Sequence, residues 1–282
     1  MSDDLAPDPA TIAAASAERT VGDAGVREGG TSGDADGAGA TDGANGDPVY
    51  AVGIGPGNPD YLTPRGERAI RDADVVVGFD SVVAYVAELA PPGTELLTCG
   101  YDDEGETLAA FADRVADGVA GTAVLMGDPN HSGYQFIGRV QRAVEAAAPA
   151  RPIRVIPGIS SLQVAASRAR TPMEDSEFVT LHKRGDLEGD LARLARAVGE
   201  RHLLVLPRPF DWMPGDIADF LLDEGADPAL DALVCEKLTH DDEAIHRFTL
   251  AELATHAGGD GRDGTPFSDL SVLVVRRPVE IE

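Results

Sequence analysis

The sequence is poor in lysine and cysteine, and each shortage excludes a class of protein. The only lysines are Lys183 and Lys237, and 23 basic residues stand against 49 acidic ones, which gives a net charge of -26 at pH 7. Such a chain repels nucleic acid and anionic membranes. The two cysteines, Cys99 and Cys235, are too few for a disulfide framework and lack metal-site spacing. We expect a reducing, cytoplasmic environment and no bound metal.

Long apolar runs are also missing. No stretch of about 18 apolar residues occurs, and no basic segment followed by an apolar one opens the chain, so we expect neither a membrane span nor a secretory signal. Residues 1–47 consist largely of Ala, Gly, Asp, Ser and Thr. They offer too little apolar surface to offset the entropy of ordering, which predicts a disordered acidic tail.

From residue 48 onward, short apolar runs alternate with amphipathic segments, which predicts an α/β fold. Strands are expected at 49–55, 74–79, 94–100, 122–127, 152–158, 177–183, 202–207, 232–238, 244–250 and 270–277. Helices are expected at 64–72, 107–119, 134–148, 160–168, 187–198 and 216–224. The pattern indicates two domains, 48–151 with a largely parallel sheet and 152–282 with a mixed sheet, because no helix separates 232–238 from 244–250.

The segment "YAVGIGPGNPDYLTP", residues 50–64, couples a strand to a glycine loop. A dinucleotide fingerprint requires a third glycine where Asn58 stands, and Thr63 and Pro64 place the helix start too late to meet a phosphate. No Walker-type G-K-[ST] occurs either. We interpret the loop as a close-packing element with exposed backbone beside a ligand. Asp80, after the next strand, keeps a dehydrogenase as an alternative, although a lone carboxylate there more often caps a following helix.

Two other strands end in comparable motifs. Gly127, Asp128 and Pro129 follow one strand and suit either a simple turn or a ligand loop. Gly158 follows another strand, and Ser160 and Ser161 come next, serving either as a helix cap or as a site for a carboxylate or ribose oxygen. Three such strand ends together predict one cleft lined with backbone groups.

These segments resemble the tetrapyrrole methylases, which transfer methyl groups from S-adenosylmethionine to precorrins, to uroporphyrinogen or to a modified histidine. The resemblance covers about residues 49–275 and rests on "VGIGPGNPDYLTPRGERAIRDADVVVG", "GDP", "IPGISSLQVAASRARTPMEDSEFVTLHKRG" and "FSDLSVLVV". Within that family, they are most similar to the branch that methylates carbon 5 of cobalt-precorrin-7. Met126 departs from the small residue common before the GDP turn, and "NHSGYQFIG" is longer than usual.

The resemblance implies two αβα domains of the class III methyltransferase type, a homodimer, and S-adenosylmethionine in the cleft. The cofactor-binding residues it implies are Pro56, Gly127, Asp128, Pro129, Ser160, Ser161, His182, Pro207 and Cys235. Those it implies for the corrin substrate are Gly55, Gly57, Arg65, Lys183 and Arg184, with Arg139 and Arg208 as further basic candidates. A decarboxylating methyltransferase, fused in some relatives, would be a separate partner protein.

The chemistry needs an oriented methyl group more than a strong acid or base. His182 is the candidate proton acceptor because it ends a strand at the expected cleft, and a structural histidine is the alternative. A methylase acting on another ring carbon and a non-catalytic nucleotide- or corrinoid-binding module are the alternative functions.

The acidic composition generates the first prediction. Few lysines and many carboxylates are typical of proteins that work in molar salt, where a Debye length of about 3 Å screens the self-repulsion. Thermal unfolding should therefore shift to a clearly lower midpoint when KCl is reduced from about 2 M to about 0.1 M. An unchanged midpoint would favour the alternative of an acidic protein adapted to ordinary salt.

Overall fold

The computed structural model of the 282-residue chain describes residues 47–131, 133–209, 211–258 and 264–278. The tail expected to be disordered lies outside these residues, apart from its last position. The chain forms two compact units that interleave along the sequence. The first unit takes the segments 47–52, 65–125 and 134–156, and the second unit takes 53–64, 126–133 and 157–278.

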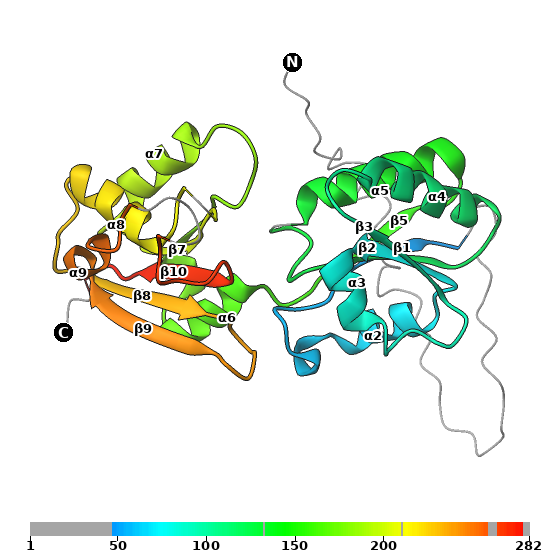
Figure 1. Cartoon of the computed structure of the whole chain (residues 1–282), viewed down its shortest axis with the longest axis horizontal. Helices are drawn as coiled ribbons and strands as arrows, with labels where there is room; N and C mark the ends of the chain where they lie inside the picture. The colour runs from blue at the N-terminus through cyan, green and yellow to red at the C-terminus, as the bar shows by residue number, and fades with distance from the viewer. Residues whose placement is uncertain (1–46, 132, 210, 259–263, 279–282) are drawn as a thin grey trace, which may run out of the picture. The chain divides into compact units, whose positions relative to one another are not determined.

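The first unit is built on a five-stranded sheet with the order β3-β2-β4-β1-β5 (Figure 1). Its strands are β1 (Val49–Gly53), β2 (Val75–Phe79), β3 (Glu95–Cys99), β4 (Gly121–Leu125) and β5 (Ile153–Ile156). β1 pairs with β5, and β2 pairs with β3 and β4, always in parallel. A parallel sheet is covered on both faces, which explains why β2 and β4 are continuous apolar runs.

Helices cover both faces of this sheet. Figure 1 shows α4 (Glu104–Ala116) and α5 (Tyr134–Ala147) on one face, with α2 (Pro64–Arg71) and α3 (Asp80–Val86) on the other. Phe111 of α4 and Val140 of α5 are fully buried and belong to one apolar cluster with Val77 and Ala123 of the sheet. On the other face, the Thr122 hydroxyl donates to the Ala69 carbonyl oxygen at 2.9 Å.

The second unit contains a mixed sheet with the order β6-β7-β10-β8-β9. Its strands are β6 (Ser176–Thr180), β7 (His202–Leu206), β8 (Asp231–Glu236), β9 (Ala244–Thr249) and β10 (Ser271–Val275). Only the β6–β7 pair is parallel, and the pairs β7–β10, β10–β8 and β8–β9 are antiparallel. The short link between β8 and β9 produces an antiparallel pair, as expected from the missing helix.

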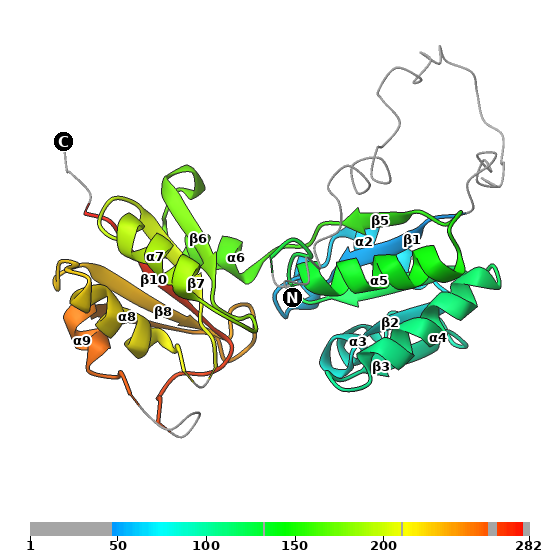
Figure 2. The ribbon, with the colours of Figure 1, turned by 90° about the horizontal axis from the view of Figure 1, so that it is seen from above.

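The helices of this unit cover both faces of its sheet, and alternate side chains of the strands pack against them. Figures 1 and 2 show α7 (Glu188–Ala197), α8 (Pro214–Asp223) and α9 (Leu250–Ala254) on one face of the sheet, with α6 (Ser161–Ala169) on the other. Leu203 and Val205 of β7 pack in the cluster that contains the residues of α7, α8 and α9, whereas Leu204 packs in the cluster of α6. The strands therefore contribute to two separate apolar cores.

The sequence-based prediction of an α/β protein with one parallel and one mixed sheet is confirmed. All ten expected strands and all six expected helices are present, with ends that differ by at most three residues. The helix α3 was expected only as a helix after Asp80, which is its first residue. The short helix α9 was not predicted, nor were the 3-10 turns at Pro59–Tyr61 and Met173–Asp175. Segments of three to five residues are too short to show a helical period, which is why the sequence pattern missed them.

The sequence pattern placed one domain boundary near Arg151, but the two units are not separated at a single position of the chain. Residues 153–156 form β5 and pair with β1 in the first sheet, so this stretch belongs to the first unit. The loops 53–64 and 126–133, which precede that boundary, belong to the second unit. Strand pairing and loop contacts decide this division, and neither follows from the order of residues along the chain.

The glycine loops of the second unit pack with their backbones in contact. A Cβ atom added at Gly53 would lie 2.6 Å from the Gly127 carbonyl oxygen and 2.7 Å from the Gly158 nitrogen. A Cβ atom added at Gly158 would lie 2.2 Å from the same Gly127 oxygen. Only residues without a side chain permit this approach, so the interpretation of a close-packing loop is confirmed.

Replacement of Gly158 should reveal this packing. Gly158→Ala forces a methyl group against backbone atoms, and overpacking of this kind destabilises by about 1–3 kcal/mol or more. The matched control is Gly189→Ala in α7, where an added Cβ meets no atom within 4 Å. Urea unfolding should show a large loss for Gly158→Ala and none for Gly189→Ala. Equal stability of the two variants would contradict the packing described here.

Candidate functional site

Three loops that follow neighbouring strands meet in the second unit. β4, β1 and β5 are adjacent in the first sheet, and the glycine loop, the Gly127 turn and the Gly158 segment follow their carboxyl ends. Gly55 and Gly127 exchange two backbone hydrogen bonds, with N–O distances of 3.2 and 2.9 Å. The predicted convergence of three marked strand ends is therefore present, and its contacts are mainly between backbones.

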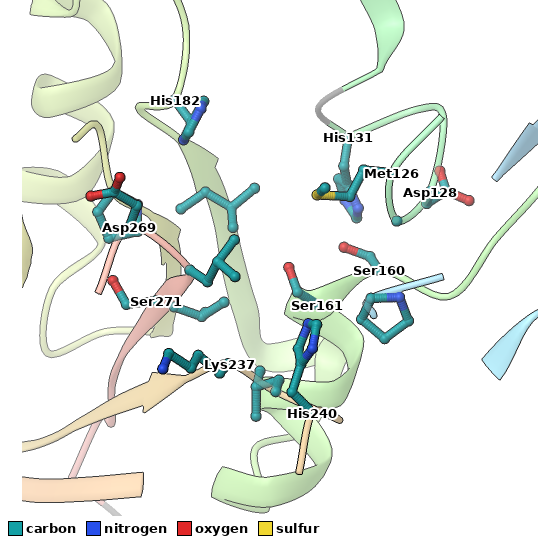
Figure 3. Close-up of a pocket in the computed structure, with 17 residues that line it drawn as sticks. Met126, Asp128, His131, Ser160, Ser161, His182, Lys237, His240, Asp269 and Ser271 are labelled. Carbon is teal, nitrogen blue, oxygen red and sulfur yellow. The ribbon is translucent and has the colours of Figure 1, made fainter. Parts of the chain in front are cut away.

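The Asp128 carboxylate links the Gly127 turn to the Gly158 segment. One oxygen of its carboxylate accepts from the Gly158 backbone nitrogen at 3.2 Å, and the other accepts from the Asn130 nitrogen at 2.8 Å. Figure 3 shows this carboxylate turned away from the centre of the pocket. Asp128 therefore holds two loops together, and its side chain stands beside the pocket.

A pocket opens where these loops meet the second sheet (Figure 3). It is lined by Pro56, Met126, Gly127, Asp128, His131, Ser160, Ser161, His182, Leu206, Pro207, Lys237, Leu238, His240, Asp269, Leu270, Ser271 and Val272. Every lining residue belongs to the second unit. The cavity volume is about 150 Å³, whereas one water needs about 10–15 Å³ by the same kind of measure. The pocket therefore has room for part of an organic ligand.

The pocket has one polar side and one apolar side. Ser160 caps α6: its hydroxyl accepts from the Leu162 nitrogen at 3.2 Å, and the Gln163 side chain accepts from the Ser160 nitrogen at 2.8 Å. Ser160 is buried, and Ser161 follows as the first helical residue. The cap role of Ser160 is therefore present, and a hydroxyl that accepts at a cap keeps a proton that it can donate to another group.

The apolar side comes from the second sheet and the segments that extend it. Leu206 is the last residue of β7 and Pro207 follows it, Leu238 lies after β8, Leu270 precedes β10, and Val272 is the second residue of β10. Leu238 and Val272 also belong to the buried cluster beneath α6. An apolar wall opposite a few hydroxyl and backbone groups is the usual composition of a site for an aromatic ring with polar attachments.

The pocket brings together seven of the nine residues expected to bind a cofactor. These seven are Pro56, Gly127, Asp128, Ser160, Ser161, His182 and Pro207. Pro129 lies outside the pocket and packs against Gly53. Cys235 also lies outside, because its fully buried side chain points into the apolar cluster beneath α6.

None of the five residues expected to bind substrate lines this pocket. Gly57 has a φ of +145°, and a Cβ added there would lie 2.1 Å from Nε2 of His240. Lys183 forms an ion pair with Asp190 at 2.5 Å. The remaining three are Gly55 in the bridge to Gly127, the exposed Arg65 at the start of α2, and the exposed Arg184 after Lys183.

The other two basic candidates are also paired with carboxylates. Arg208 contacts both oxygens of Asp211, at 2.8 and 2.6 Å. Arg139 of the first unit forms an ion pair with Glu104, whose side chain is largely buried. Glu104 is the first residue of α4 and is turned inward.

The sequence pattern missed ten lining residues, which are Met126, His131, Leu206, Lys237, Leu238, His240, Asp269, Leu270, Ser271 and Val272. The sequence could have indicated three of them: Met126 directly precedes the GDP turn, and Asp269 and Leu270 lie in "FSDL", part of a segment that carries the resemblance. It could not have indicated His131, whose ring stacks on Phe178 of β6 with centroids 6.2 Å apart. A contact between residues 47 positions apart has no signature in the sequence.

Two kinds of feature are missing from the part of the chain that the structure describes. No helix there is long and apolar enough to cross a bilayer. No group of three or more His, Cys, Asp or Glu side chains there is arranged to hold a metal ion.

Residues 48–254 match the family of Tetrapyrrole (Corrin/Porphyrin) Methylases. Among curated proteins, the chain is 28% identical over 233 residues to a probable cobalt-precorrin-7 C(5)-methyltransferase of Methanocaldococcus jannaschii, an alignment that covers 83% of this chain and 100% of the relative. It is 32% identical over 130 residues to a cobalt-precorrin-4 C(11)-methyltransferase of Priestia megaterium, covering 44% of this chain and 47% of the relative.

Solved structures share the fold at lower identity. A precorrin-6Y methylase of cobalamin biosynthesis from Archaeoglobus fulgidus has a TM-score of 0.56 and 21% identity, covering 82% of this chain and 99% of its own. A uroporphyrin-III C-methyltransferase from Thermus thermophilus, solved with S-adenosylhomocysteine, has a TM-score of 0.60 and 21% identity, covering 81% and 92%.

The burial of the two free thiols, Cys99 and Cys235, leads to a testable prediction. Burial raises the pKa of Cys235 to about 12, with a further contribution from Glu243. Burial raises the pKa of Cys99 to about 11, with Glu104 as the next cause. Thiolates are the reactive form, so neither cysteine of the folded protein should react with a thiol reagent near neutral pH, whereas both should react after unfolding. Rapid labelling of Cys235 in the native protein would contradict its place beneath α6.

Proposed function

Because the chain belongs to the tetrapyrrole (corrin/porphyrin) methylases, we propose that it transfers a methyl group from S-adenosylmethionine to carbon 5 of cobalt-precorrin-7. Family membership gives the reaction class, which is S-adenosylmethionine-dependent methylation of a tetrapyrrole carbon. The observation that carries the cofactor site is the pocket of the second unit, where Pro56, Gly127, Ser160 and Pro207 meet although they come from four separate segments.

The residues present fit the methyl donor. Leu206, Leu238 and Val272 offer an apolar wall for an adenine ring. Ser160 and Ser161 offer hydroxyls, and the Gly127 turn offers backbone groups, all suited to ribose and carboxylate oxygens. Pro129 and Cys235, outside the pocket, would act by shaping its walls.

When bound, S-adenosylmethionine supplies an electrophilic methyl group on a sulfonium. The protein's contribution is to hold the donor and the corrin in register, and orientation of this kind supplies about 7–11 kcal/mol in favourable cases. His182, exposed at the rim of the pocket, would accept the proton that leaves the methylated carbon. The apolar wall would keep water away from the part of the donor that it contacts.

The corrin carries several carboxylate arms, for which Arg65, Lys183 and Arg184 are the proposed partners, together with the backbones of Gly55 and Gly57. Lys183 and Arg184 follow His182 directly along the chain, so they would meet the arms beside the proton acceptor. Since Lys183 is paired with Asp190, binding of an arm requires exchange of that carboxylate.

Carbon 5 is favoured because the probable C(5)-methyltransferase aligns over its whole length, whereas the C(11)-methyltransferase aligns over less than half. Methylation of another ring carbon is the nearest alternative, and a binding module without catalytic activity is the alternative from another class. A homodimer and a separate decarboxylating methyltransferase remain part of the proposal.

Titration with S-adenosylhomocysteine tests the cofactor site. In about 2 M KCl, the wild-type protein should bind one equivalent, and Ser161→Trp should abolish binding by filling the pocket. Ser167→Trp is the matched control, because Ser167 lies on the same helix but is exposed and outside the pocket. A folded wild-type protein without measurable binding would refute the proposal.

The ring carbon is tested separately. Incubation with cobalt-precorrin-7 and a methyl donor carrying carbon-13 should add one labelled methyl group, and NMR of the product should place it on carbon 5. Label at another carbon would support a different methylase of the family. Binding of donor and corrin without any transfer would support the non-catalytic module.

A further inference from the structure

The turn after β8 carries an unusual backbone conformation beside the pocket. Lys237 has a φ of +47° and Thr239 a φ of +72°. A β-branched residue such as threonine rarely adopts this left-handed region, and such residues persist only when surrounding contacts hold them. Lys237, Leu238 and His240 all line the pocket, so the shape of this turn determines part of its wall.

Glu243 holds the strained residue. Its Oε2 atom accepts from the backbone nitrogen of Thr239 at 2.7 Å. The same carboxylate forms a bidentate pair with Arg168 of α6, with distances of 2.7 Å from Nε to Oε1 and 3.2 Å from Nη2 to Oε2. Arg168 lowers the pKa of Glu243, so the carboxylate is charged near neutral pH and its hydrogen bonds are charge-assisted.

Thr239 passes this support on to the glycine loop. Its buried hydroxyl oxygen accepts from the Asn58 nitrogen at 3.1 Å. One residue further along, the His240 ring packs against Gly57. Pro56, which lines the pocket, lies in the same loop. One carboxylate thus connects the helix that starts with the two serines, the strained turn and the glycine loop.

We infer that Glu243 is a positioning residue for the methyl donor, acting through the left-handed Thr239 turn without touching the ligand. This inference rests on the proposed function, because it assumes that the pocket binds S-adenosylmethionine. Without the carboxylate, the turn relaxes toward ordinary backbone angles, and only a fraction of molecules presents the complete wall. The apparent dissociation constant rises as that fraction falls.

The test compares Glu243→Gln with Glu177→Gln in titrations with S-adenosylhomocysteine. Glu177 of β6 is a matched control: it pairs with Arg193 at 2.5 Å, and the side chains of its pair are 26% and 46% exposed, against 21% and 37% for Glu243 and Arg168. If a tenth of the Glu243→Gln molecules is competent, binding weakens about tenfold. Glu177→Gln should bind as the wild type does.

A rescue experiment distinguishes positioning from general destabilisation. Thr239→Gly removes the energetic cost of the left-handed backbone angle, but it also removes the hydroxyl that accepts from Asn58. The substitution is therefore made both in the wild type and in Glu243→Gln, and the loss of the Asn58 bond cancels when the two effects on affinity are compared. Its effect on affinity should be more favourable in Glu243→Gln than in the wild type. Equal effects in the two backgrounds would overturn the inference.

The outcomes separate the two proposals. Absence of binding by the folded wild type refutes the donor site itself. Binding by the wild type with equal affinities for Glu243→Gln and Glu177→Gln leaves the proposed function intact and refutes the role of Glu243. If Glu243→Gln fails to fold, Arg168→Gln replaces it. This change removes the ion pair that holds the Glu243 carboxylate in place, so the bond from Thr239 should weaken and the affinity should fall. Wild-type affinity in that variant would overturn the inference.

Discussion

The structure of the site depends on the close approach of three glycine backbones. Gly53, Gly127 and Gly158 lie at the ends of three strands that are neighbours in one parallel sheet, and they touch through main-chain atoms. Any side chain at Gly53 or Gly158 would separate the loops. Because the loops meet, the Gly127 turn and the start of α6 bound one pocket, and Asp128 can bridge them with hydrogen bonds to two backbone nitrogens.

The opposite wall depends on a different constraint. The mixed sheet supplies apolar side chains from β7 and β10, but the turn after β8 reaches the pocket only with Thr239 in a left-handed conformation. This unfavourable angle is offset by a charge-assisted hydrogen bond from the Thr239 nitrogen to Glu243 and by the Arg168 pair. The strained residue and the carboxylate that compensates it lie four positions apart, and Arg168 reaches that carboxylate from α6; backbone strain of this kind is common at ligand sites.

The excess of acidic residues shapes the chemistry near the pocket. Lys183, Arg208 and Arg168 are each paired with a carboxylate of the protein itself. A substrate with carboxylate arms must therefore compete with internal partners at such positions, and exposed ion pairs of this kind are individually weak enough to exchange. The serine hydroxyls, which also line the pocket, are neutral and do not face that competition.

The sequence by itself determined the element order, the parallel and mixed character of the two sheets, and the three glycine-marked strand ends. Each of these depends on local period, turn chemistry or the length of a connection, which are properties of neighbouring residues. It also indicated Ser160 and Ser161, because a helix cap directly after a strand has a short and recognisable pattern.

Only the tertiary structure decided which residues share the pocket and which lie beneath it. Cys235 ends in an apolar core because the alternation of β8 points it toward α6, while Lys237, two residues further on, reaches the pocket because the strand has ended and the turn has changed direction. His131 meets Phe178, and Glu243 meets Arg168, across 47 and 75 positions. Such contacts follow from the packing of helices and strands, which residue spacing does not specify.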